Sequence, residues 1–250
     1  MIKLSFSRLN TYLQCHRRYL YQYVQQLPRK DWDHFTAGSQ VHLLLEKMYK
    51  LKGRLQDNIE INHLTDHLIK RASFTEYGKK LTLSQQDEIN YIIVQYKQLY
   101  VDTFRNKFIV EQPFNFKLGE IEIEGFIDRV DFPPKFEGFD IEILDYKMAK
   151  QPKYLDKSLQ LPLYAIATKE KYGYDKVVKT SYILLRHGCK KVSHIYTNEY
   201  LDHVKEEIKD IATQISKDIM WVESASPLCS YCDFEAVCSE RAAWQDVTFN

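Results

Sequence analysis

The chain has 250 residues, of which 44% are hydrophobic and 28% are charged, an ordinary composition for a soluble protein with one sizeable core. Its formal net charge is +1, so no global field attracts nucleic acid and any basic surface must be local. The sequence has no apolar run near the roughly 20 residues of a membrane span, and no apolar signal region, so we expect a cytoplasmic protein without a membrane partner.

The first predicted helix is capped by Ser5 or Ser7 and continues to about Leu27. The sequence before position 31 contains several basic residues but no acidic one. A solvated helix face is the ordinary explanation of such a run, but the missing counter-charges favour an anionic partner. The arginines of this helix that are candidates to contact such a partner are Arg8, Arg17 and Arg18.

A second helix is predicted to open at Ala37-Gly38-Ser39 and to carry His42. A lone histidine on a helix is more often a structural residue than a metal ligand, although neutral imidazole is a workable ligand. Residues 57–80 are weakly periodic and suggest no chemistry. A further amphipathic helix, capped by Ser84 and ending near Asn106, is predicted to serve as scaffold.

The region 120–147 predicts a β-hairpin, because two runs of alternating polar and apolar residues flank a turn that contains proline and glycine. Asp145 and Lys147 share one face of the second strand, and Asp128 interrupts an apolar row on the first. Burying such charges costs several kcal/mol each unless a partner compensates. A divalent cation would compensate the carboxylates, whereas an exposed ion pair between Asp145 and Lys147 is the simpler alternative.

A helix is predicted from about Leu155 to Tyr172, and Gln160 and Tyr164 lie one turn apart on the same face of it. Such a pair has almost no specificity by itself. Two further strands and an amphipathic helix complete the predicted order, over Val177–Leu185, Val192–Tyr196 and Tyr200–Trp221.

The carboxy-terminal part of the chain contains a C-x2-C-x5-C array formed by Cys229, Cys232 and Cys238. Three thiolates leave one ligand position open, and Cys15 is the candidate for it. Cys189 has no partner motif and is interpreted as a bystander. Structural zinc and an iron–sulfur cluster both accept four cysteines, and the ligand count does not separate them.

Taken together, these motifs resemble a known family. Gly125-Phe126-Ile127-Asp128 followed by Asp145-Tyr146-Lys147 resembles the PD-(D/E)XK nucleases, specifically their RecB-like branch. Gly38–His42 resembles the Gly-x-x-x-His motif that precedes the hairpin in this branch, and Gln160 with Tyr164 resembles the Gln-x-x-x-Tyr motif that follows it. The spacing of the cysteines resembles the iron–sulfur arrangement of the AddB-type and CRISPR-adaptation nucleases. The resemblance spans nearly the whole chain.

The resemblance implies a restriction-endonuclease-like α/β fold, in which helices flank a central mixed β-sheet. It implies one nuclease domain over residues 1–250, with a catalytic core at about 108–196. It further implies that segments 1–30 and 223–250 are joined by a 4Fe–4S cluster, with zinc as the weaker alternative. The implied cluster ligands are Cys15, Cys229, Cys232 and Cys238.

The implied activity is DNA phosphodiester hydrolysis that depends on Mg²⁺ or Mn²⁺. The implied metal ligands are His42, Asp128, Asp145 and the backbone carbonyl of Tyr146. The implied catalytic residues are Asp128, Asp145, Lys147, Gln160 and Tyr164, and the implied contacts to DNA phosphates are Arg8, Arg17 and Arg18.

The expected enzyme is an exonuclease on single-stranded or frayed DNA ends, in DNA repair and recombination or in CRISPR adaptation. The sequence contains no P-loop motif, so the chain would act alone or with a helicase or integrase-type protein partner. The alternative is a catalytically inactive iron–sulfur subunit that binds DNA within a helicase–nuclease or integration complex. The intact acids and lysine favour the enzyme, and a redox role of the cysteines is compatible with either.

Overall fold

The structure is a computed structural model of the whole chain, and it describes residues 2–30, 33–52, 67, 70, 81–100, 107–134 and 138–238. Most of the weakly periodic region 57–80 therefore lies outside the described residues. The chain divides into two compact units. Unit 1 comprises Met1–Asp31, Phe116–Glu124 and His203–Asn250, and unit 2 comprises Trp32–Asn115 and Gly125–Asp202.

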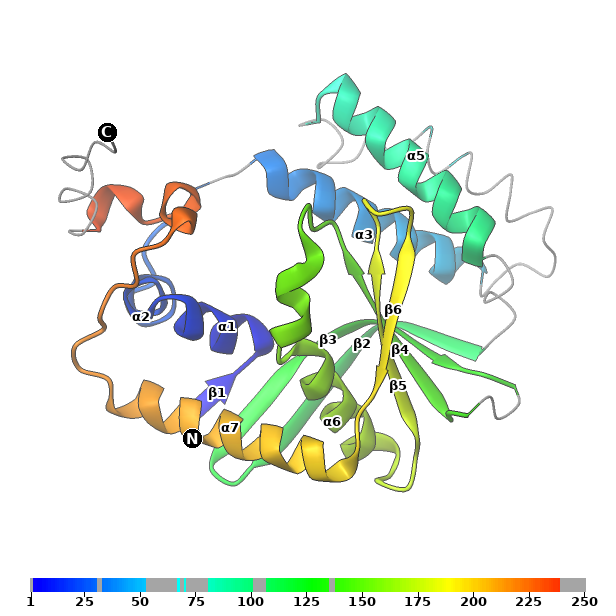
Figure 1. Cartoon of the computed structure of the whole chain (residues 1–250). Coiled ribbons are helices and arrows are strands. Elements are labelled where there is room, and N and C mark those ends of the chain that lie inside the picture. The colour runs from blue at the N-terminus through cyan, green and yellow to red at the C-terminus, as the bar shows by residue number, and fades with distance from the viewer. Residues whose placement is uncertain are drawn as a thin grey trace. The chain divides into compact units, whose positions relative to one another are not determined.

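Unit 2 is built on a mixed β-sheet (Figure 1). Its adjacent strands are, in spatial order, β3 (Ile121–Phe132), β4 (Ile141–Lys147), β5 (Val178–Leu184) and β6 (Lys190–Ile195). The β3–β4 and β5–β6 pairs are antiparallel, whereas β4 and β5 are parallel. Strand β2 (Lys107–Leu118) also pairs with β3. The predicted hairpin and mixed sheet are confirmed.

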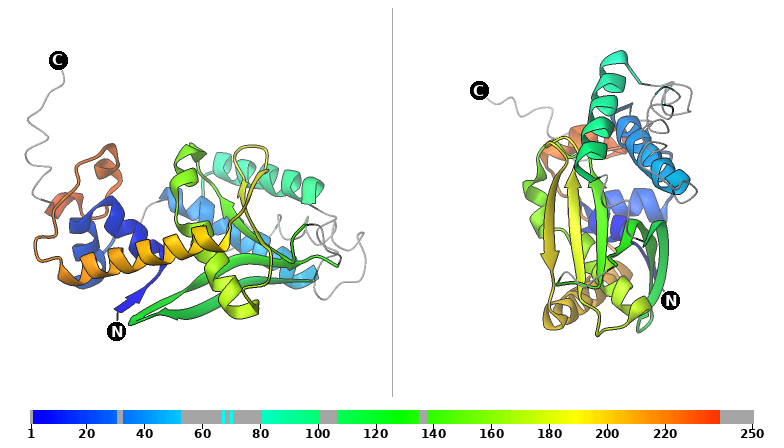
Figure 2. Two further views of the ribbon diagram at one scale, coloured as in Figure 1. Left: turned by 60° about the horizontal axis from the view of Figure 1, so that its bottom comes forward. Right: turned by 90° about the vertical axis from the view of Figure 1, so that its right-hand side faces the viewer.

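Helices lie on both faces of this sheet. The helices α3 (Asp33–Lys52) and α5 (Leu83–Tyr100) pack side by side, and their apolar residues share a buried cluster with Leu144 and Tyr146 of β4 (Figure 1). Helix α6 (Gln160–Tyr172) follows a short 3-10 helix and packs against β5. Because successive strand residues point to opposite faces, Asp145 faces away from α3 and α5. Figure 2 shows these elements from two further sides.

The start of α5 differs from the prediction. Thr82 caps the helix rather than Ser84, since its Oγ1 accepts a hydrogen bond from the Gln85 amide at 3.3 Å. In return, Oε1 of Gln85 accepts one from the Thr82 amide at 2.9 Å. This reciprocal capping box starts the helix at Leu83.

Unit 1 contains β1 (Ile2–Leu4), which pairs in parallel with the first residues of β3, and the amino-terminal helices. The predicted helix to about Leu27 is capped by Ser5, as one of the two candidates, but is interrupted at Cys15: the chain forms α1 (Phe6–Gln14), then α2 (His16–Tyr19), which continues as a π-helix over Leu20–Val24. Cys15 separates them with an extended backbone, φ −167° and ψ 115°. Its sulfur caps α2 by accepting the Arg18 amide at 3.4 Å. Because of this break, the Cys15 sulfur lies at the amino-terminal end of α2 and not on the side of a continuous helix.

The remainder of unit 1 comes from the carboxy-terminal part of the chain. Helix α7 (Asn198–Lys217) begins in unit 2 and continues into unit 1, where its carboxy-terminal part is followed by an extended stretch. Two short 3-10 helices, Pro227–Tyr231 and Glu235–Val237, carry the cysteine array.

Side-chain contacts hold the two ends of the chain together within unit 1. The Tyr12 hydroxyl donates to Asp218 at 2.9 Å, and Arg17 donates to the Trp221 carbonyl at 2.8 Å and to Glu223 at 3.0 Å. Further ion pairs join Arg29 to Asp233 at 3.1 Å and Lys30 to Glu235 at 3.4 Å. The counter-charges that are missing from the first thirty residues are thus supplied from about two hundred residues further along the chain.

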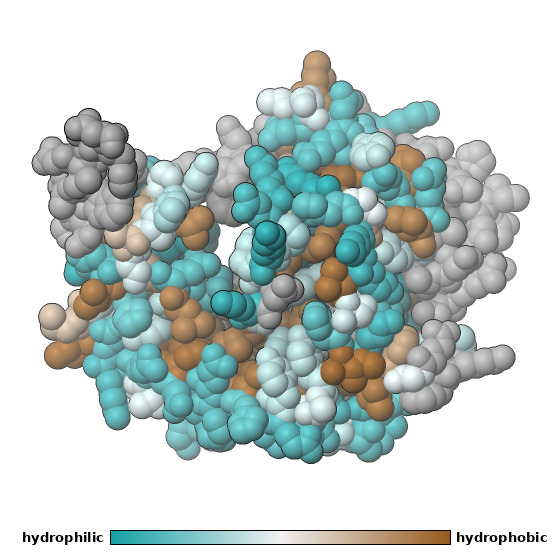
Figure 3. All heavy atoms as spheres, viewed as in Figure 1, coloured by the Kyte–Doolittle hydropathy of each residue, from teal (hydrophilic) through white to brown (hydrophobic). Residues whose placement is uncertain are grey.

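Among the described residues, no helix has the length and apolar character needed to cross a membrane. On the face shown in Figure 3, hydrophobic residues are interspersed among hydrophilic ones.

Candidate active site

Two carboxylates and a lysine meet where β3 and β4 pair. The register places Arg129 opposite Leu144, so Asp128 and Asp145 lie one position further along and share a face. Asp145 is only 2% exposed. Lys147 Nζ lies 2.6 Å from Asp145 Oδ2, yet this oxygen accepts no hydrogen bond of normal geometry. The ammonium group therefore neutralises charge without fixing the orientation of that oxygen.

His42 and the backbone of Tyr146 complete the group of predicted metal donors. The imidazole Nδ1 of His42 lies 3.5 Å from Asp128 Oδ2, and Nε2 lies 3.0 Å from the Tyr146 carbonyl oxygen. The Tyr146 amide donates to Asp128 Oδ2 at 2.9 Å. Helix α3 and strands β3 and β4 thus bring the predicted donors to one place.

Burial sets the protonation of this group. The pKa of Asp128 is raised well above its ordinary value, first by desolvation and then by the neighbouring Asp145 charge. The pKa of His42 is lowered, chiefly by burial, which favours the neutral imidazole that coordinates metals. Two close carboxylates that repel one another are the arrangement that a cation stabilises.

Gln160 and Tyr164 from α6 reach the same carboxylates. Gln160 Nε2 donates to Asp145 Oδ1 at 2.9 Å and to the Tyr164 hydroxyl at 3.0 Å. Both side chains are at most 7% exposed. The pair had almost no specificity as a sequence motif, but the structure places it directly behind Asp145.

Sequence reasoning missed Glu111 on β2. Its backbone has φ 49°, in the left-handed region that non-glycine residues rarely adopt, and such strain is concentrated at functional sites. Burial raises the pKa of this half-buried carboxyl, the nearby Glu46 raises it further, and His42 opposes the shift. The signal is a backbone conformation, so no residue pattern could have indicated it.

The types of donor in this group suit a divalent cation, although their arrangement is not that of a complete metal site. Within the described residues, no three His, Cys, Asp or Glu side chains are arranged to hold a metal ion. The available donors nevertheless are two carboxylates, a neutral imidazole and a carbonyl oxygen, which Mg²⁺ and Mn²⁺ accept. Asp145 Oδ2 is buried and lies 2.6 Å from Lys147 Nζ, so a metal ion bound there would share this oxygen with the ammonium group or displace it.

In unit 1 the predicted cluster ligands line one pocket of about 790 Å³. These ligands are Cys15, Cys229, Cys232 and Cys238, all of them free thiols. Backbone amides approach two of the sulfurs. The Ser224 amide lies 3.5 Å from the Cys15 sulfur, and the Ser226 amide lies 3.4 Å from the Cys229 sulfur. Hydrogen bonds of this kind stabilise thiolate ligands, but the four sulfurs, all within the described residues, are not arranged to hold a metal ion, so the cluster stays a prediction.

The three predicted DNA-binding arginines differ in their surroundings. Arg8 donates to the Lys3 carbonyl at 2.9 Å, and its guanidinium lies 5.0 Å from the centre of the Tyr23 ring. Arg17 is engaged by Glu223, and Arg18 lines the cysteine pocket. The structure places them in unit 1, and their contact with DNA stays a prediction.

Comparison with known proteins identifies the family. The profile of the PD-(D/E)XK nuclease superfamily matches residues 3–239, which include every predicted site residue. The chain belongs to this superfamily. The match does not reach the iron–sulfur subgroup, so superfamily membership establishes a nuclease and leaves the cluster unassigned.

The fold is shared with a solved structure. A candidate exonuclease from Eubacterium rectale superposes with a TM-score of 0.54 at 10% identity, covering 99% of this chain and 89% of that one. A second structure, named SSO0001, has a TM-score of 0.42 at 13% identity, covering 95% and 86%, and carries no argument at that level. No curated protein matches the chain.

Proposed function

We propose that this superfamily member is a metal-dependent deoxyribonuclease whose active site is formed by Asp128, Asp145 and Lys147. The observation that carries the proposal is the meeting of the buried Asp145, the partly buried Asp128 and an ammonium group on one sheet face. Superfamily membership supports the nuclease class. DNA as the substrate and Mg²⁺ or Mn²⁺ as the metal follow from the donor set and the family resemblance.

The residues divide the work as follows. His42, Asp128, Asp145 and the Tyr146 carbonyl would hold the divalent ion, which would polarise a phosphoryl oxygen and lower the pKa of a water molecule. Lys147, as an ammonium group, would orient that water and offset the negative charge that develops on the phosphoryl oxygens. Gln160 fixes Asp145 by its hydrogen bond to Oδ1, and Tyr164 supports Gln160.

The proposed substrate is a single-stranded or frayed DNA end that is digested exonucleolytically, in DNA repair or CRISPR adaptation. Support comes from the RecB-like motifs and from the structural relative described as a candidate exonuclease. That relative shares only the fold, so the substrate rests on analogy. One nuclease domain over residues 1–250, with a core at about 108–196, is part of this proposal.

The proposal includes a 4Fe–4S cluster on the four cysteines that line the pocket of unit 1. The shared pocket and the amide contacts to two sulfurs support a metal centre. The cysteine spacing is the reason for preferring iron–sulfur.

A catalytically inactive DNA-binding subunit is the competing function. It would keep the fold and the cysteine pocket but would need no oriented lysine. The intact set of Asp128, Asp145 and Lys147, with Lys147 2.6 Å from Asp145, favours the enzyme.

The test is cleavage of end-labelled single- and double-stranded DNA by anaerobically purified protein, with and without Mn²⁺. Asp145→Ala and Lys147→Ala should each abolish cleavage while the protein stays folded, since each removes a group that acts on the reacting phosphate. Asp87→Ala, an exposed acid on α5, is the matched control and should cleave normally. Undiminished cleavage by either active-site variant would remove that residue from the mechanism.

A further inference from the structure

A buried polar network lies on the sheet face opposite the carboxylates. Its centre is Arg129 of β3, whose side chain is completely buried. Arg129 forms a two-pronged ion pair with Asp131, with Nε 2.5 Å from Oδ1 and Nη2 in contact with Oδ2. Nη1 donates to the hydroxyls of Tyr49, which is in contact, and of Tyr96, at 2.9 Å. The guanidinium also stacks 4.0 Å from the centre of the Tyr49 ring.

Three tyrosine hydroxyls extend this network across the core. The Tyr96 hydroxyl lies 2.7 Å from that of Tyr49 and 3.1 Å from that of Tyr146. All three tyrosines are at most 4% exposed. Tyr96 is therefore the junction, since its hydroxyl contacts Arg129 and both other tyrosines.

Each element that carries a metal donor also contributes to this network. Arg129 directly follows Asp128 on β3, and Tyr49 follows His42 by two turns on α3. Tyr146 stands between Asp145 and Lys147 on β4, and its own backbone contacts both Asp128 and His42. The Tyr146 hydroxyl thus takes part in the polar network on one face of the sheet, while the amide and carbonyl of the same residue contact Asp128 and His42 at the proposed metal site.

Stability alone does not account for such a network. Burying an arginine and an aspartate removes their hydration, and well-packed apolar residues of similar volume are often at least as stabilising. A fully connected polar network does fix one arrangement of the elements that it joins. Metal sites need that fixity, because a donor displaced by a fraction of an ångström loses affinity.

We propose that Tyr96 is a positioning residue, which sets the metal donors through its hydrogen bond to Tyr146 and its contacts with Arg129 and Tyr49. This inference rests on the proposed metal-dependent function. Helix α5 is in this view more than scaffold, because the Tyr96 hydroxyl that it supplies contacts residues of α3, β3 and β4.

The test compares Tyr96→Phe with Tyr100→Phe in the full chain. Tyr100 is the matched control, since it lies one turn further along α5, is also buried and donates its hydroxyl to the Cys189 carbonyl at 2.7 Å. Mn²⁺ binding is measured by calorimetry, and DNA cleavage is measured across a range of Mn²⁺ concentrations. Tyr96→Phe should weaken Mn²⁺ binding about tenfold or more, the usual effect of removing a residue that orients metal ligands. Tyr100→Phe should bind Mn²⁺ like the wild type.

A second variant guards against a folding defect in Tyr96→Phe. Tyr146→Phe removes only the Tyr146 hydroxyl that contacts Tyr96, and it should also weaken Mn²⁺ binding. Combining it with Tyr96→Phe should add little, because both changes break the same hydrogen bond. Additive losses would contradict the inference.

The outcomes separate the inference from the proposed function. If the wild type binds Mn²⁺ and cleaves DNA, while Tyr96→Phe and Tyr100→Phe bind Mn²⁺ equally well, the positioning role is overturned and the nuclease stands. A wild type that neither binds Mn²⁺ nor cleaves DNA overturns the proposed function, and the positioning role with it.

Discussion

The two oxygens of Asp145 have different surroundings, and that asymmetry defines the site at the level of single residues. Oδ1 accepts a hydrogen bond from Gln160 at 2.9 Å. Oδ2 faces Lys147 at 2.6 Å without a directed hydrogen bond. One oxygen is thus held by a neutral amide, while the other is left for a cation.

Replacing Gln160 with leucine should therefore lower the cleavage rate about 10- to 100-fold, because Asp145 loses the donor that orients it. Tyr164→Phe is the companion variant and should lose less, since Tyr164 touches Gln160 by its hydroxyl. Steady-state cleavage rates at saturating Mn²⁺ give both values. Equal losses would mean that the two residues act as one unit on the DNA strand instead of through Asp145.

Among the single residues of the site, those that belong to a short sequence pattern could be predicted. Strand alternation put Asp145 and Lys147 on one face, and the resemblance added His42 and Gln160. Glu111 could not be predicted, because its distinguishing feature is a backbone angle.

Among the elements, the hairpin follows from its sequence pattern, whereas helix ends depend on details that patterns miss. Alternation with a period of two fixes strand faces over many residues. The position of a helix end depends on a single capping side chain, such as the Thr82 hydroxyl or the Cys15 sulfur. Other residues nearby were equally plausible caps, so the sequence did not identify the right one. The break at Cys15 has no signal in the surrounding apolar periodicity.

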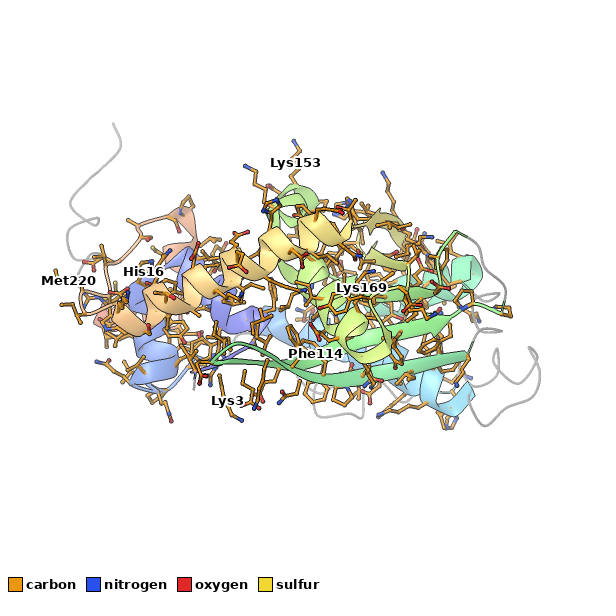
Figure 4. All side chains as sticks on the ribbon, turned by 90° about the horizontal axis from the view of Figure 1, so that it is seen from below. Lys3, His16, Phe114, Lys153, Lys169 and Met220 are labelled. Carbon is orange, nitrogen blue, oxygen red and sulfur yellow. The ribbon has the colours of Figure 1, made fainter. Side chains whose placement is uncertain are left out.

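Gly125 of β3 is required by a close approach of β2. A Cβ there would lie 2.7 Å from Cζ of Phe114, whose ring centre is 5.7 Å from that of Tyr164 (Figure 4 labels Phe114). Gly125→Ala should therefore destabilise the protein by about 1–3 kcal/mol, the usual cost of overpacking. The denaturation midpoint measures this loss.

Gly38→Ala is the control for this substitution, since a Cβ on Gly38 would meet no heavy atom within 4 Å. Alanine is also favoured in a helix such as α3, by up to about 1 kcal/mol, so Gly38→Ala should leave the midpoint unchanged or raise it. A midpoint for Gly125→Ala that matches the wild type would show that Phe114 moves aside freely.

Across the whole chain, the sequence gives the order of the elements but not the contacts between distant segments. The positive charges of the first thirty residues have no acidic partner nearby in the sequence, but in the fold they pair with Glu223, Asp233 and Glu235. The junction of Tyr49, Tyr96 and Tyr146 was equally hidden, because it joins elements separated by about fifty residues at each step. Such partners carry no local pattern, so only the folded chain identifies them.

The cysteine pocket leads to a prediction about the ends of the whole chain. A cluster that joins Cys15 to the carboxy-terminal array closes a loop of more than two hundred residues, so its loss should free both ends. Cys229→Ser should yield protein that lacks the iron and brown colour of the wild type and is cleaved faster by protease within 1–30 and 223–250. Iron content, absorbance and limited proteolysis of anaerobically purified protein measure this.

Cys189→Ala is the matched control for the loss of a thiol. Cys189 is completely buried in the apolar core of unit 2 and does not line the pocket that the other four cysteines share. This variant should keep the iron and the protease resistance of the wild type. A colourless wild type that contains zinc would refute the iron–sulfur assignment, but the same ends would still be tied, because either metal closes the same loop through the same sulfurs.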